Sequence, residues 1–311
     1  EAATDIGIRF HPTRGSMSIG ESKGGLPPDV LTENESDILK DCERVISQFH
    51  DDSPNAMIKI ALAPCSPFSV SNDLMSQTAV LARENNLCMH THLAENSEDV
   101  EYSLEKFNMR PGEYAESLGW LGDDVWHAHC VKLDSAEVKL FGKTNTGIAH
   151  CPSSNMRLAS GIAPLLEMLE NNVRVGLGVD GSSSNDSGHM LNEARQAMLL
   201  QRVKHSASVI GARDVLRTAT RGGAEVLRRG NIGQIAPGFM ADIAIYDMQS
   251  VDLAGTHTDP LAALVFCGPI KTTHTVINGN LVVKHGQLTT MDLNALLQKH
   301  RKLSVELVNS A

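Results

Sequence analysis

The chain has 311 residues, 41% hydrophobic and 21% charged, which is an ordinary globular composition. A formal net charge of −10, a pI near 5.7 and the lack of a basic block argue against general nucleic-acid binding. No apolar run approaches the ~20 residues of a membrane span, no signal peptide is recognisable, and six scattered cysteines form no Cys-x-x-Cys pair, so we expect a cytoplasmic protein.

The first 230 residues alternate between strand and helix patterns. Strands are predicted over 6–12, 57–64, 87–93, 124–131, 146–152 and 173–180, with a Gly/Pro-rich loop over 13–28 after the first. Helices are predicted over 35–49, 72–86, 111–118, 134–141, 162–171, 189–203 and 211–228, with another after residue 95. Such alternation predicts a parallel sheet with helical crossovers.

The pattern changes after residue 230. A turn and a strand near 240–247 are followed by two short strands that flank Asn278-Gly279, a strong hairpin signal. A terminal helix is predicted over 291–309. We therefore expect a barrel over residues 1–230, part of a small β-sandwich over 231–290 and a C-terminal helix over 291–311.

Polar residues gather where the predicted parallel strands end. His90 and His92 share one strand face because residues two apart point the same way, and Glu95 lies just beyond that strand. The other strand-end residues of this kind are Arg14, Ser66, His129, His150 and Asp180. Active sites of (β/α)₈ barrels lie at this edge. An open doubly wound sheet is the alternative, but no Gly-x-Gly-x-x-Gly follows a first strand.

These residue types indicate a metal site with proton transfer. His92 offers an imidazole nitrogen to zinc or iron, and Asp180 offers a carboxylate that binds metal or acts as a base. Glu95 is the candidate general acid and base, and His129 can hold a hydroxide or a substrate atom.

Five motifs in chain order resemble the amidohydrolase superfamily, in the branch of the guanine, S-adenosylhomocysteine and triazine aminohydrolases. They are His92-Leu93-Ala94-Glu95, Ala128-His129-Cys130-Val131, the stretch from His150 to Asn155, the stretch from Gly178 to Asn185, and the stretch from Gly238 to Asp247. Residues 14–28 and 63–70 look more specifically like the bacterial 8-oxoguanine deaminases, with triazine-processing hydrolases similar in the same places.

The resemblance implies a (β/α)₈ TIM-like metallo-hydrolase barrel, a small β-sandwich and one divalent metal, usually zinc, with iron as the alternative. It makes His92 and Asp180 metal ligands and gives His129 the task of positioning the hydroxide or the substrate. Glu95 would carry the proton to the ring nitrogen beside the attacked carbon.

One departure concerns the start of the barrel. The family has a His-x-His pair on its first strand, whereas the first strand predicted here corresponds by motif order to the family's third. We therefore expect the first two βα units, and the leading part of the β-sandwich, to lie outside this sequence. The alternative is an inactive truncated remnant without the His-x-His ligands.

The predicted activity is hydrolytic deamination of an oxidised purine, 8-oxoguanine first, to urate and ammonia. Guanine, S-adenosylhomocysteine and triazine aminohydrolases are the alternatives. The predicted partner is a small heterocycle rather than nucleic acid or membrane, and a homo-oligomer is expected. Candidate substrate-binding residues are Arg14, Ser16, Ser66, His150 and Asn185.

Overall fold

A six-stranded parallel sheet forms the centre of the computed structural model, which describes residues 1–268 and 270–310. Its strands lie in chain order and are β1 (Thr13–Ser16), β2 (Ala61–Pro64), β3 (Cys88–Leu93), β4 (Val125–His129), β5 (Gly147–His150) and β6 (Arg174–Leu177). Consecutive parallel strands joined by helices are the arrangement of an α/β TIM-like barrel. Among the described residues β1 pairs only with β2 and β6 only with β5, so this sheet has two open edges.

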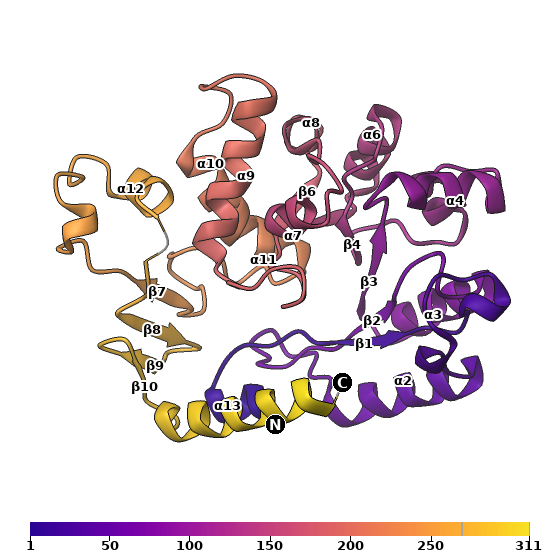
Figure 1. Ribbon diagram of the computed structural model, residues 1–311, viewed down its shortest axis with the longest axis horizontal. Helices are drawn as coiled ribbons and strands as arrows, with labels where there is room; N and C mark the ends of the chain where they lie inside the picture. The colour runs from indigo at the N-terminus through magenta and orange to yellow at the C-terminus, as the bar shows by residue number, and fades with distance from the viewer. Residues whose placement is uncertain (269, 311) are drawn as a thin grey trace.

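Helices cover the outer face of the sheet, and α2, α3, α4, α6 and α8 follow one another around it in Figure 1. Their bounds are α1 (Ala2–Ile6), α2 (Glu35–Phe49), α3 (Asn72–Glu84), α4 (Ser97–Phe107), α5 (Pro111–Ser117), α6 (Ser135–Thr144), α7 (Pro152–Arg157), α8 (Leu165–Glu170), α9 (Met190–Lys204), α10 (Ala212–Arg217), α11 (Gly223–Val226), α12 (Pro260–Phe266) and α13 (Leu293–Ser310). Short 3₁₀ turns lie at Glu21–Lys23, Asp29–Leu31 and Val251–Leu253, and one π-helical turn, Thr218–Gly222, joins α10 to α11. None of the described helices is both long and apolar enough to cross a bilayer.

Strand β3 shows how the sequence separates core from site. Met89 and Leu93 are buried in the main hydrophobic cluster, with residues of the outer helices. His90 and His92 alternate with them and instead line a cavity on the inner face. The period of two along a strand thus sends the apolar side chains outward to the helices and the histidines inward.

A second, antiparallel sheet lies beside the barrel sheet (Figure 1). Its strands are β7 (Ile243–Ile245), β8 (His274–Ile277), β9 (Asn280–Lys284) and β10 (Gln287–Leu288). The predicted hairpin is confirmed, because Asn278 and Gly279 both have positive φ, as a type I′ turn requires. Arg9 joins this sheet to the N-terminal segment through an ion pair from Nε to Asp242 Oδ2 at 2.6 Å.

Two sequence predictions differ from the structure. The strand predicted over 6–12 is wrong: β1 is Thr13–Ser16, within the stretch predicted as loop, and Phe10 makes only an isolated bridge to Ile58. Gly and Ser have weak strand preference, but pairing with β2 along the whole of β1 overrides it. Helices α1, α7 and α12 were not predicted, since each is only five to seven residues long, too short for a clear helical period.

Candidate metal centre

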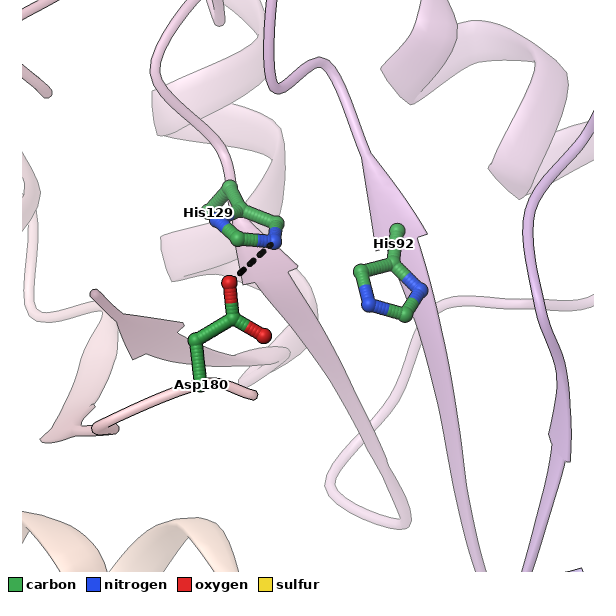
Figure 2. Close-up of side chains that lie close together, drawn as sticks. All are labelled: His92, His129 and Asp180. Atoms are coloured by element: carbon green, nitrogen blue, oxygen red, sulfur yellow. Dashed lines mark ion pairs between the residues drawn. The ribbon is translucent and has the colours of Figure 1, made fainter. Parts of the chain in front are cut away.

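Three potential metal ligands converge at the carboxyl edge of the barrel sheet (Figure 2). His92 comes from β3, His129 ends β4 and Asp180 follows β6. One donor atom from each lies within 4.8 Å of the others, and the two imidazole rings stack with centroids 5.4 Å apart. Two imidazoles and a carboxylate are typical zinc or iron ligands, so the donor set suits such a metal.

The backbone around these residues is strained. Left-handed φ values occur at Ala94 (51°), His129 (70°), Cys130 (51°) and Asp180 (61°), none of which is glycine or asparagine. Each such residue costs on the order of 1–3 kcal/mol, and strain of this kind clusters at functional sites. The strain turns the chain sharply just where the side chains converge.

The ring of His92 is oriented from the neighbouring strand end. Its Nδ1 lies 2.6 Å from the backbone carbonyl oxygen of Cys65, which can only accept a hydrogen bond. Burial opposes a charge on this ring, but the hydrogen bonds to Cys65 and the charge of Asp180 outweigh it and raise the pKa of His92 to about 9. A metal at Nε2 would therefore displace a proton.

His129 lies between an amide and two carboxylates. Its Nδ1 is 3.0 Å from Nδ2 of Asn155, and its Nε2 is 3.5 Å from Glu95 Oε2 and 4.0 Å from Asp180 Oδ2. Burial and the adjacent His92 lower the pKa of His129 to about 4, so the ring is neutral at pH 7.

Two hydroxyl groups hold the carboxylate of Asp180. Ser154 donates to Oδ2 at 2.6 Å and Ser184 donates to the same oxygen at 3.0 Å. Burial would raise the pKa of Asp180, but these bonds and one from the Gly181 amide outweigh burial and keep the pKa below its ordinary value. The carboxylate is thus charged and directed, as a metal ligand requires.

At Glu95 the effect of burial on the pKa exceeds that of hydrogen bonding, the reverse of Asp180. Burial raises its pKa above the ordinary carboxyl value, although a hydrogen bond from Ser160 Oγ at 3.2 Å opposes the rise. A raised pKa makes a carboxyl group a better proton acceptor, which suits a group that passes protons.

The remaining predicted site residues lie in different surroundings. Ser16 lines a cavity of about 360 Å³ with Cys65 and His92, whereas Ser66 is buried and bonds to Ser69. The other two predicted residues in this region are buried: neither ring nitrogen of His150 has a hydrogen-bond partner among the described residues, and Asn185 bonds to Glu193.

Arg14 lies apart from the metal centre. Its guanidinium pairs with Asp41 of α2 at 2.6 Å and with Glu33 at 2.9 Å. The two carboxylates thus bind different nitrogens of the guanidinium. A role of Arg14 toward substrate stays a prediction.

The sequence predictions missed Ser154, Asn155 and Ser160, each of which contacts a predicted site residue. A signal was available, because Pro152 directly after a strand is a typical first helical residue. A short helix that begins at Pro152 places Ser154 and Asn155 beside the ends of the strands.

Comparison with known proteins agrees with this geometry. The sequence pattern of the amidohydrolase family matches residues 1–282. The 8-oxoguanine deaminase of Pseudomonas aeruginosa is 43% identical over 304 residues, which cover 98% of this chain and 68% of that protein. The hydroxydechloroatrazine ethylaminohydrolase of Pseudomonas sp. strain ADP is 36% identical over 94% of this chain and 61% of its own length.

Solved structures are similar as well. Atrazine chlorohydrolase TrzN from Arthrobacter aurescens TC1, complexed with zinc, superposes with a TM-score of 0.93 at 35% identity, over 97% of this chain and 67% of that one. An adenosine deaminase from Xanthomonas campestris with bound zinc gives a TM-score of 0.90 at 26% identity, over 99% and 68% of the two chains. The chain thus spans about two thirds of these relatives.

Proposed function

This chain belongs to the amidohydrolase family, and from that premise we propose that it hydrolytically deaminates 8-oxoguanine to urate and ammonia. The convergence of His92, His129 and Asp180 within 4.8 Å, with Glu95 beside them, is the observation that carries the proposal. The substrate follows from the relative named 8-oxoguanine deaminase, whose similarity covers nearly the whole chain.

We propose that His92 and Asp180 hold one divalent metal, zinc first and iron as the alternative. When bound at such a site, a metal lowers the pKa of water from 15.7 toward ~7. Support comes from the imidazole and carboxylate donors and from zinc in two similar solved structures.

The other steps fall to the side chains. Asp180 would take a proton from the attacking water as the new C–O bond forms at the ring carbon that carries the amino group. Glu95 would pass that proton to the adjacent ring nitrogen, which avoids a ring anion. Asp180 would then take the remaining proton of the new hydroxyl group as C=O forms and give it to the departing amine as the C–N bond breaks, releasing ammonia.

We further propose that residues 1–230 form the catalytic barrel and residues 231–290 part of a β-sandwich, with a separate helix over 291–311. A closed barrel has no edge strands, whereas the described sheet ends at β1 and β6. Additional strands from outside residues 1–311 would close it and supply further metal ligands.

The experiment is a side-by-side kcat/KM for 8-oxoguanine, guanine, isoguanine and hydroxyatrazine on the zinc-loaded protein. We expect 8-oxoguanine to give the highest value, with ammonia and urate released in equal amounts. A higher value for guanine or hydroxyatrazine would reject the substrate assignment. No turnover of any of the four by protein with bound zinc would reject the deaminase proposal for this site.

A further inference from the structure

The segment from Ser154 to Ser160 contacts side chains from three different strand ends. Ser154 bonds to Asp180, Asn155 to His129 and Ser160 to Glu95. Asn155 is only 1% exposed, so its amide has no access to bulk water. The two serine contacts favour the ionised form of a carboxyl group, whereas the amide contact acts on an imidazole, whose two nitrogens can exchange roles.

The two nitrogens of His129 face different surroundings. A neutral imidazole carries one N–H, so one nitrogen donates and the other accepts. Nε2 faces carboxylate oxygens of Glu95 at 3.5 Å and Asp180 at 4.0 Å. A proton at Nε2 is attracted to both oxygens, whereas a lone pair there would be repelled by them. Nδ1 must then accept, and the Asn155 amide nitrogen, 3.0 Å away, is positioned to donate.

His92 provides the contrast within the same site. Its Nδ1 faces the Cys65 carbonyl oxygen at 2.6 Å, which can only accept. The proton of neutral His92 is therefore held at Nδ1, and the lone pair at Nε2 is left for a metal. The stacked rings of His92 and His129 thus have opposite partners at Nδ1.

We propose that Asn155 is a positioning residue that holds His129 as the Nε2–H tautomer, making His129 a hydrogen-bond donor to substrate or water rather than a metal ligand. The identity of the group that accepts this hydrogen bond during the reaction depends on the proposed function. The tautomer depends only on the contacts of His129 with Asn155, Glu95 and Asp180.

Substitutions at Asn155 separate the tautomer from simple packing. Asn155→Asp keeps the shape but places two acceptor oxygens beside Nδ1, so a proton should move to Nδ1. Asn155→Leu keeps the volume but offers neither donor nor acceptor, so both tautomers should be populated. Met156→Leu is the matched control, since Met156 is 41% exposed on the same helix.

The measurement is a long-range ¹H–¹⁵N correlation on histidine-labelled, metal-free protein at pH 7.5, with the His129 signal identified by its loss in His129→Gln. We expect Nδ1 of His129 to be unprotonated in the wild-type protein and in Met156→Leu, averaged in Asn155→Leu and protonated in Asn155→Asp. A protonated Nδ1 in the wild-type protein, or an unprotonated Nδ1 in Asn155→Asp, would overturn the proposal.

Zinc content and kinetics complete the test. Since His129 is not a ligand in this proposal, Asn155→Leu should keep wild-type zinc stoichiometry while kcat falls about 10- to 100-fold, the usual effect of losing such an orienting partner. Loss of zinc from that variant would contradict the assignment of His129 as a donor. If no heterocycle is deaminated, the proposed function fails, but the tautomer in metal-free protein is measured all the same.

Discussion

His92 and His129 stack against each other, yet only His92 has a backbone carbonyl fixed behind it. This difference predicts that His92 dominates metal binding. His92→Ala should lose most bound zinc, as measured by elemental analysis after dialysis. His205→Ala, which removes an exposed histidine, is the control and should keep full occupancy. Wild-type stoichiometry in His92→Ala would remove His92 from the ligand set.

Glu95 combines partial burial with a position 3.5 Å from Nε2 of His129. Glu95→Gln keeps the shape and the hydrogen bond from Ser160 but cannot carry a proton. We expect zinc content to persist while kcat falls by ~10²-fold or more, the usual scale for general acid–base groups. A rate equal to wild type would show that Glu95 has only a structural role.

Arg14 is the residue for which sequence and structure suggest different roles. Its pairing with Asp41 and Glu33 predicts that Arg14→Ala lowers the free energy of unfolding by about 1 kcal/mol, the upper end for partly exposed ion pairs. The ratio of kcat/KM for 8-oxoguanine over guanine should stay within twofold of wild type. A drop in that ratio at unchanged stability would support the specificity role predicted from sequence. Arg213→Ala, which breaks a more exposed pair with Asp259, should have the smaller effect on stability.

At the scale of elements, the π-helical turn Thr218–Gly222 packs directly on β6, which leads to Asp180. A methyl group added at Gly222 would overlap the carbonyl oxygen of Val175, whereas one added at Gly223 meets nothing within 4 Å. We expect Gly222→Ala to lower the free energy of unfolding by roughly 1–3 kcal/mol through overpacking. Gly223→Ala should raise it by about 0.5–1 kcal/mol, since both residues have helical φ. Urea titrations give the free energy of unfolding of the two variants. Equal values would mean that the π-helical turn does not pack tightly enough on β6 to exclude a methyl group at Gly222.

Most long elements could be predicted because their periodicity is strong. Helix α2 matches its predicted bounds, and β3 begins one residue later than expected. Strand β1 could not be predicted, since the Thr-Arg-Gly-Ser stretch pairs only because β2 lies beside it. Asn155 was missed for a related reason: Pro152 marks the start of the six-residue helix α7, but the contact of Asn155 with His129 at the end of β4 is long-range and does not follow from local sequence.

Strand ends and family motifs predict His92 and Asp180 as metal ligands, and the structure brings these two residues together. What sequence could not give was orientation. Arg14 and Ser16 are two residues apart and would share one strand face by the alternation rule, yet Arg14 pairs with Asp41 of α2 while Ser16 lines the cavity, and local sequence does not distinguish these surroundings.

For the molecule as a whole, buried histidines make stability sensitive to acid. Burial, followed by the nearby charges of Arg229 and Lys59, lowers the pKa of His11 from 6.5 to about 3. Below pH 6.5 the unfolded chain takes up a proton that the folded protein refuses, so stability is lost progressively as pH falls from 6.5 toward 3. His11 should contribute up to ~1.4 kcal/mol per pH unit in this window.

Urea unfolding of His11→Gln between pH 7 and 4.5 should show a shallower loss of stability than wild type. His257→Gln, at an exposed histidine, should follow the wild-type curve. A His11→Gln curve parallel to wild type would mean that protonation of other groups drives acid unfolding.

The ion pair between Arg9 and Asp242 joins residues 233 positions apart. Ribosomes synthesise ~5–20 residues per second, so Asp242 is added to the chain roughly 12–47 s after Arg9. During that interval the segment before β1 lacks its anchor to the second sheet. The segment before β1 is therefore anchored only after all six strands of the barrel sheet have been synthesised.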